Sequence, residues 1–403
     1  MQIREQIEYY QKIFSSFGAL EGGGITRLLY TDQWYEALKR LELEIKKVGF
    51  KSEFDNVGNL FGIIEGYSNE FVSTGSHIDS VVEGGNLDGQ FGIVAGLIAI
   101  QNLVKKYGKP QKTFQLVALA EEEGSRFPTV FWGSKNVMGI AKKQDVINIK
   151  DKNGKKFTDE MKRLGFKFKE ENDRRNLGKF VEIHIEQGNL LENLNKPIGV
   201  ITAITGQKRY DVKIQGQANH AGTTRMCYRK DAIYAYSCIV KEAIEKAVET
   251  DDLLVCTFGR VNIIPNTVNV VPGVCEFSID CRHPDKKILA EFSKWLERRM
   301  DEIAIKHKVD IDYKLWMDQE PVPMDKEMID LIEKSVKELE FDYEIMHSGA
   351  GHDSQIFAEF VPTGMIFVPS IGGISHNIHE KTDISDLEKG IKVLEKTLYK
   401  LAY

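Results

Sequence analysis

The sequence has few cysteines, and no two of them are spaced as C-x-x-C. The five cysteines, an odd number, all fall between residues 227 and 281 of a 403-residue chain. A disulfide framework is therefore not expected, and reduced, mostly buried thiols are typical of a cytosolic protein. Their clustering also indicates that the middle of the chain is a separate unit.

Long apolar runs and an excess of positive charge are also lacking. No run reaches the roughly 20 apolar residues that a membrane-spanning helix needs, and the first ten residues, MQIREQIEYY, contain no apolar signal core. With 54 Lys and Arg against 60 Asp and Glu, the net charge is −6. Electrostatic binding to nucleic acid or to an anionic membrane is therefore not expected, and a cytoplasmic location is.

The length predicts two compact units, and a hydrophobic content of 42% predicts a soluble globular protein. At both ends of the chain, apolar strands alternate with helices, as is typical of an α/β sheet. Strands are expected at 58–65, 70–77, 113–120 and 362–369, and helices at 32–48, at 92–106 and from 386 onward.

The pattern changes near residue 208, where a strand that alternates between apolar and polar residues begins. The following elements are expected to be a helix at 231–249, strands at 253–261 and 275–282, and a helix at 285–307. This β-α-β-β-α order is typical of a small α+β domain. We predict an α/β catalytic domain (1–207 and 319–403) with a mixed, mostly parallel sheet between helices, and an inserted α+β lid or dimerisation domain (208–318).

Potential metal ligands follow the strands of the first unit. His77 ends a strand, Asp88 lies eleven residues further on in a glycine-rich turn, and three glutamates (121–123) follow the next buried strand. Ligand sites of open α/β sheets lie at the carboxyl ends of strands. Each residue alone, like His184 and His376, is more often structural. Together they predict a site for two divalent ions, with Asp88 as the natural bridge.

Motifs along the whole chain resemble those of the dinuclear amidohydrolases of the aminoacylase and carboxypeptidase superfamily, in the branch of N-carbamoyl amino acid hydrolases and allantoate amidohydrolases. They are GSHIDSV (75–81), GGNLDGQFG (84–92), EEEGSRF (121–127), HIEQG (184–188), NHAGTTRM (219–226), NVVPG (269–273), SGAGHD (348–353) and GISHN (373–377). Two departures are Arg225, where Pro is common, and the sequence Asn-Ile-His-Glu at 377–380, where the family usually has Asn-Pro-x-Glu.

The resemblance implies two divalent ions, Mn²⁺ first, with Zn²⁺ or Co²⁺ as alternatives. The implied ligands are His77, Asp88, Glu123, His184 and His376. Glu122 would be the general base that takes a proton from the bridging water, with Glu121 as its competitor. His379 competes with His376 as the last ligand, and spacing from the SGAGHD motif favours His376.

The resemblance also implies a set of residues around the substrate. They are Gln187, Gln207, His220, Asn269, Arg282, Gly351 and His352. Arg282 would clamp a carboxylate, unless it pairs with Asp280 or Asp285 instead. Asn269 either joins it or satisfies its own turn. His220 either bonds its own loop or donates to the oxyanion of a partner subunit, which would make the protein a homodimer with a site completed in trans.

The activity that the resemblance implies is hydrolysis of the ureido C–N bond of allantoate to ureidoglycine, ammonia and carbon dioxide, a step of allantoin breakdown. The same ligands would suit hydrolysis of N-carbamoyl-L-amino acids or N-carbamoyl-β-alanine, and a metallo-exopeptidase is a more distant alternative. A ureide-binding sensor without activity is the alternative outside the enzymes.

Overall fold

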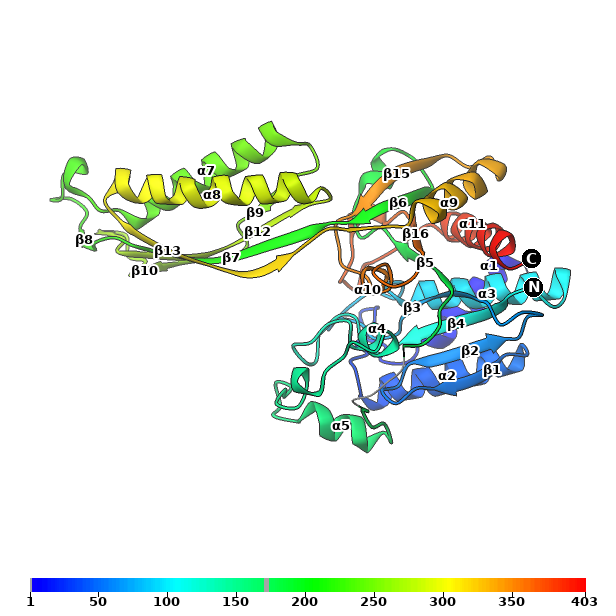
Figure 1. Cartoon of the computed structure of the whole chain (residues 1–403). Coiled ribbons are helices and arrows are strands. Elements are labelled where there is room, and N and C mark those ends of the chain that lie inside the picture. Colours follow the sequence, from blue (N-terminus) through cyan, green and yellow to red (C-terminus); the bar gives the residue numbers. More distant parts are fainter. Residues whose placement is uncertain (1, 170–173) are drawn as a thin grey trace. The chain divides into compact units, whose positions relative to one another are not determined.

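The computed structural model describes residues 2–169 and 174–403. The chain forms two compact units (Figure 1), unit 1 with Met1–Thr202 and Met324–Tyr403, and unit 2 with Ala203–Pro323. The domain limits expected at 208 and 318 fall inside the first and last long strands of unit 2, Gly206–Gln215 and Asp310–Gln319. No helix in the described ranges is long and apolar enough to cross a membrane.

The described residues of unit 1 contain a nine-stranded mixed sheet in the order β1-β2-β4-β3-β5-β16-β6-β14, with β15 paired to β6. Its strands are Lys51–Phe54 (β1), Leu60–Ile64 (β2), Phe71–His77 (β3), Thr113–Leu119 (β4), Lys179–Ile185 (β5), Ile198–Ile204 (β6), Val322–Pro323 (β14), Tyr343–Ser348 (β15) and Thr363–Val368 (β16). The central strands β4, β3, β5 and β16 are parallel, and β1, β2, β6 and β14 pair antiparallel at the flanks. The α/β prediction is confirmed.

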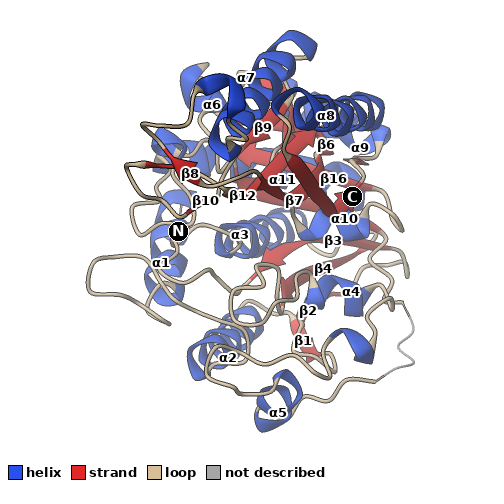
Figure 2. Ribbon diagram, turned by 90° about the vertical axis from the view of Figure 1, so that its left-hand side faces the viewer, coloured by secondary structure: helices blue, strands red, loops and turns tan. Residues whose placement is uncertain are grey.

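Helices cover both faces of this sheet. They are Ile3–Phe14 (α1), Asp32–Lys47 (α2), Gln90–Tyr107 (α3), Trp132–Val137 (α4), Phe157–Arg163 (α5), Leu190–Asn193 (α6), Lys326–Glu338 (α9), Asp353–Phe357 (α10) and Ile384–Ala402 (α11). Leu116 and Ala118 of β4 pack into the core shared with α1, α2, α3, α9 and α11, whereas Val117 and Leu119 pack into a second core with α4 and α10. Burial on both faces explains why β4 is apolar apart from Thr113 and Gln115. Figure 2 shows α3 alongside β3 and β4.

Unit 2 is an antiparallel sheet in the order β10-β12-β7-β13, with β9 on β12, and a separate ribbon of β8 and β11. Its elements are Gly206–Gln215 (β7), Asn219–His220 (β8), Ala232–Thr250 (α7), Val255–Thr257 (β9), Val261–Ile264 (β10), Val270–Val271 (β11), Val274–His283 (β12), Lys286–His307 (α8) and Asp310–Gln319 (β13). Residues alternate between partly buried and buried along β12, because α7 and α8 cover one face. The α+β prediction is confirmed.

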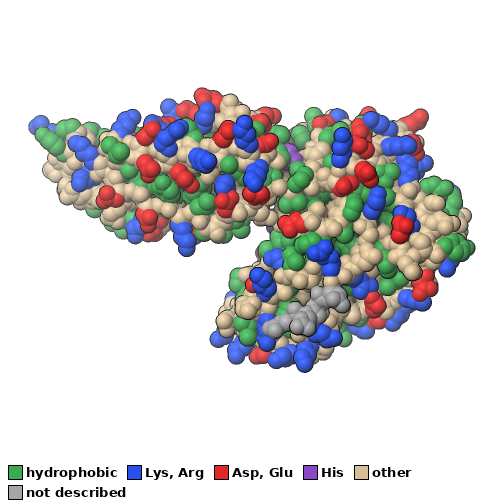
Figure 3. Space-filling model, in the orientation of Figure 1, with side chains coloured by type: hydrophobic (Ala, Val, Ile, Leu, Met, Phe, Trp, Pro, Cys, Tyr) green, Lys and Arg blue, Asp and Glu red, His purple; other side chains and the backbone are tan. Residues whose placement is uncertain are grey.

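The single strand expected at 253–261 is wrong. The segment forms β9 and then, after a break that contains Gly259, begins β10. The two pieces pair with different parts of β12, Cys256 opposite Cys281 and Val261 opposite Phe277. On the face seen in Figure 3, Lys and Arg side chains are interspersed with Asp and Glu on each unit, as the nearly balanced composition predicts.

Candidate metal centre

The expected metal ligands meet at one edge of the unit 1 sheet. His77 is the last residue of β3, residues 122–123 follow β4, and His184 lies in β5. Asp88 lies just before α3, and His376 lies in the loop after β16. Because β3, β4, β5 and β16 are parallel, their carboxyl ends lie together, and this brings the side chains into one cluster.

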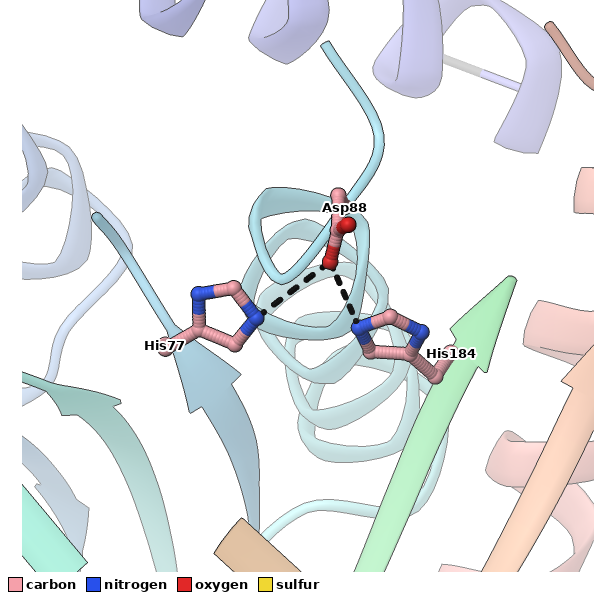
Figure 4. Close-up of side chains that lie close together, drawn as sticks. All are labelled: His77, Asp88 and His184. Carbon is pink, nitrogen blue, oxygen red and sulfur yellow. Dashed lines mark ion pairs between the residues drawn. The ribbon is translucent and has the colours of Figure 1, made fainter. Parts of the chain in front are cut away.

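Asp88 lies at the centre of this cluster. Its Oδ1 is 3.4 Å from His77 Nε2 and 3.1 Å from His184 Nε2 (Figure 4). Its Oδ2 is 3.2 Å from His376 Nε2, which is 3.5 Å from Glu123 Oε2. The carboxylate therefore divides its two oxygens between a first set (His77, Asp88, His184) and a second set (Asp88, Glu123, His376).

The spacing of these atoms fits two divalent ions. Two atoms bound at about 2.0–2.1 Å to one tetrahedral ion lie about 3.3–3.4 Å apart. The four distances from Asp88 and Glu123 to the histidines run from 3.1 to 3.5 Å. Within the described residues, the other oxygen of Glu123, Oε1, is buried and makes no hydrogen bond. A buried oxygen of this kind needs a cation or a donor.

The backbone orients both histidines of the first set. His77 Nδ1 lies 3.1 Å from the carbonyl oxygen of Asp79, and His184 Nδ1 lies 2.9 Å from that of Ile185. A carbonyl only accepts hydrogen bonds, so each Nδ1 carries a hydrogen and each Nε2 faces Asp88. Metal-binding histidines typically have this arrangement.

Asp79 is a site residue that the sequence reasoning missed. Its carboxylate accepts the backbone N–H groups of Glu122 and Glu123, each at 3.2 Å, and so fixes the turn after β4. Glu121 turns away, because its Oε1 accepts the N–H of Gly124 at 2.5 Å. Glu122 instead lies within ligand distance of His77 and Glu123. The only signal for Asp79 was its place two residues after His77.

Gly89, the residue after Asp88, lets the His77 ring approach the backbone of the turn closely. Its φ is +65°, and a Cβ there would lie 2.4–2.5 Å from three atoms of the His77 ring. Only glycine allows this approach without strain.

Charge and burial perturb the acids and bases of this cluster. Burial raises the pKa of Glu122 well above its usual value and that of Glu123 to about 7. Burial alone would also raise the pKa of Asp88, but His184, His376 and His77 hold it well below its usual value. The hydrogen bond to Asp88 raises the pKa of His376 to about 9. At neutral pH the site thus retains protons that a cation would displace.

Metal binding is therefore expected to strengthen as pH rises. Below about pH 7 both Glu123 and His376 must lose a proton to act as ligands, and between 7 and 9 only His376 must. Mn²⁺ affinity of the second set, measured against a chelator from pH 6 to 9, should rise steeply at first, then by about one log unit per pH unit, and level off near pH 9. An affinity that is constant over this range would contradict the proton displacement.

Two of the expected substrate residues of unit 1 contact candidate metal ligands. Gln187 Nε2 donates to Asp88 Oδ2 at 2.9 Å, and the His352 ring lies 4.6 Å from that of His184. Gly351 directly precedes His352. His379 is exposed and belongs to neither set of described residues with ligand spacing, whereas His376 belongs to the second.

The other expected substrate residues form two pairs in unit 2. Gln207 lies directly opposite Arg282 across β7 and β12. The guanidinium of Arg282 makes two hydrogen bonds of 3.0 Å to the carboxylate of Asp280, so the expected alternative partner is present. His220 lies opposite Val270 in the β8–β11 ribbon, and the carbonyl of Asn269, just before β11, accepts the N–H of Ala221 at 3.0 Å.

The loop fixes the hydrogen of the His220 ring. Its Nδ1 accepts the backbone N–H groups of Gly222 at 3.0 Å and Thr223 at 3.3 Å. The hydrogen of a neutral ring must then be on Nε2, which leaves His220 as a donor.

The fold and the two ligand sets fit a metal-dependent hydrolase, and the family and relatives of the chain make it one that acts on C–N bonds. Residues 73–400 match Peptidase family M20/M25/M40, and the chain belongs to this family. It is 51% identical to allantoate amidohydrolase of Escherichia coli (99% of this chain, 98% of the relative) and 40% identical to that of Bacillus subtilis (100% and 99%). A solved amidase of the hydantoinase/carbamoylase family from Burkholderia multivorans has a TM-score of 0.95 at 30% identity, over 99% of this chain and 98% of that one. The resemblance drawn from the motifs is confirmed.

Proposed function

We propose that this enzyme hydrolyses the ureido C–N bond of allantoate, giving ureidoglycine, ammonia and carbon dioxide. The observation that supports metal-dependent hydrolysis is the position of Asp88 between two ligand sets, with Glu122 beside them. The choice of substrate is supported by the names of the two relatives at 51% and 40% identity. The amidase of the carbamoylase family is less similar, at 30%.

The residues of the site would divide the chemistry among them. Two divalent ions in the two sets, Mn²⁺ in our proposal, would activate water and polarise the ureido carbonyl. Glu122 takes a proton from the attacking water and returns it to the terminal nitrogen. The bond from the carbonyl carbon to that nitrogen breaks, and ammonia leaves. The carbamate left on the substrate then loses carbon dioxide.

Unit 2 supplies the groups for substrate recognition in this proposal. Arg282 anchors the substrate carboxylate, with its guanidinium plane held by Asp280. Gln207 and Asn269 add polar contacts, as Gln187, Gly351 and His352 do from unit 1. His220 donates from Nε2 to the developing oxyanion.

The geometry of unit 2 supports a homodimer with a shared site. Arg282 is opposite Gln207, and Val274 is opposite Gln215 at the other end of the same ladder. These ends are eight residues apart, or about 26 Å at 3.3 Å per residue, and the ribbon with His220 follows Gln215 (Figure 1). One small substrate cannot span that length. We therefore infer that Arg282 and His220 act on one substrate from two subunits.

Mixed dimers test this sharing. His220→Ala and Glu122→Gln homodimers should both be nearly inactive. Co-refolded in equal amounts they should regain about a quarter of wild-type activity, because half of the dimers are mixed and each has one complete site. The matched control mixes wild type with the double variant His220→Ala/Glu122→Gln. This mixture should retain about a quarter of wild-type activity, whereas it would retain about half if each subunit carried a complete site. The absence of any recovery in the first mixture would refute sharing.

A substrate panel tests the proposed activity. Metal-free protein reloaded with Mn²⁺, Zn²⁺ or Co²⁺ should release ammonia from allantoate faster than from N-carbamoyl-L-amino acids or N-carbamoyl-β-alanine. Preference for a carbamoyl amino acid would make the enzyme a carbamoylase, and release of amino acids from a dipeptide would make it an exopeptidase. Tight allantoate binding without turnover would favour a sensor. A cytoplasmic location is part of the same proposal.

A further inference from the structure

Glu380 is a buried acid beside the metal centre that belongs to neither ligand set. Its side chain is 6% exposed. Its Oε1 accepts the backbone N–H groups of Leu87 at 2.9 Å and of Asp88 at 3.1 Å. Its Oε2 lies 2.9 Å from the hydroxyl of Ser375, the residue before His376. One carboxylate therefore joins the turn that carries Asp88 to the loop that carries His376.

The turn closes tightly around this carboxylate. A Cβ on Gly85 would lie 2.0 Å from Glu380 Oε1. That distance is far inside van der Waals contact, so any side chain at position 85 would push the carboxylate away from the two N–H groups that it accepts.

The two ligand sets differ in how firmly the fold holds them. The first set takes His77 and His184 from the strands β3 and β5. The second takes His376 from a loop, where its φ is +52° and its side chain is half exposed. A loop-borne ligand depends on its neighbours for its position, because partners beyond the ligands orient them and tune affinity.

Ser375 adds a second link between Glu380 and Asp88. Its hydroxyl lies 3.2 Å from Asp88 Oδ2 as well as 2.9 Å from Glu380 Oε2, and it has a single hydrogen to donate. While Glu380 takes that hydrogen, Asp88 Oδ2 accepts from Gln187 Nε2, and its other electron pair stays available for a cation in the second set.

We propose that Glu380 is a positioning residue that holds Asp88 and His376 in register and so sets the affinity of the second metal position. This inference concerns the metal centre and is independent of which substrate is hydrolysed. Loss of Glu380 should weaken the second position much more than the first.

Titration of metal-free protein with Mn²⁺, in the absence of substrate, tests the proposal. The binding step that His376→Ala abolishes identifies the second position, and the step that His184→Ala abolishes identifies the first. Glu380→Ala and Gly85→Ala should each weaken the second step by about 10- to 100-fold and the first by less than about threefold. Adding Gly85→Ala to Glu380→Ala should weaken the second step little further, because the carboxylate that Gly85→Ala would displace is already absent. Glu380→Gln should lie between the alanine variant and wild type, because its amide oxygen can still accept from the turn.

The control is Asp55→Ala. Asp55 also accepts three backbone N–H groups of a turn, those of Val57, Gly58 and Asn59, each at 2.9 Å, but that turn carries no metal ligand. It should lower thermal stability without changing either binding step. Unchanged affinities in Glu380→Ala would overturn the proposal, and so would equal losses at both steps. Neither result would depend on whether allantoate is the substrate.

Discussion

Glu122→Gln is expected to lower kcat by about 1,000- to 10,000-fold, at the upper end of what one acid–base residue contributes. Glutamine keeps the size of the side chain but cannot accept a proton from water at neutral pH. Glu122 is in neither set that shares Asp88, so the variant should still bind two ions. KM should change only a few-fold. Steady-state kinetics with metal analysis of the same sample would check both statements.

The matched control for this prediction is Glu121→Gln. The Glu121 carboxylate accepts the N–H of Gly124, and the amide oxygen of glutamine can still do so, so this variant should lower kcat by less than about tenfold. If Glu121→Gln were the more damaging of the two, Glu121 would be the base, contrary to our proposal. More than a tenth of wild-type activity in Glu122→Gln would also contradict it.

Asp88→Asn is expected to have a comparable or larger effect for a different reason. Both ligand sets use this carboxylate, and an amide provides one neutral oxygen instead of two charged ones. Metal content should fall below one ion per chain at concentrations that saturate the wild type. Without the ions, the transition state loses several kcal/mol of stabilisation, and kcat should fall by about 10⁴-fold or more.

Asp79→Asn provides the comparison for that variant. Asp79 is equally buried, but its carboxylate accepts the backbone N–H groups of Glu122 and Glu123 and belongs to neither ligand set. Two ions should remain bound, with activity about 10- to 100-fold lower. Loss of both ions in Asp79→Asn and their retention in Asp88→Asn would reverse the roles assigned here.

The sequence predicted the grouping of the candidate metal ligands because parallel strands bring their carboxyl ends together. His77, Asp88, Glu123, His184 and His376 meet there. Residues that act on these ligands rather than on the ions could not be found in the same way. Asp79 and Glu380 show no periodicity, and their importance comes from backbone N–H groups that become neighbours only in the fold.

The break of the strand expected at 253–261 was also beyond the sequence. Apolar and β-branched residues continue on both sides of Gly259, so the pattern indicated one strand. The pairing with β12 divides the segment. Cys256 and Val261 are five residues apart, but their partners in β12, Cys281 and Phe277, are only four apart, so one residue between β9 and β10 has no partner in a continuous register. Such offsets depend on the partner strand.

The ligands of the second set are widely separated along the chain, from Asp88 to His376. A bound ion would therefore act as a reversible cross-link that closes a loop of 288 residues and removes conformations open to the unfolded chain. All of unit 2 lies within that loop. Removing the ions with a chelator should therefore destabilise unit 1 selectively. The melting temperature of unit 1 should fall more than that of unit 2.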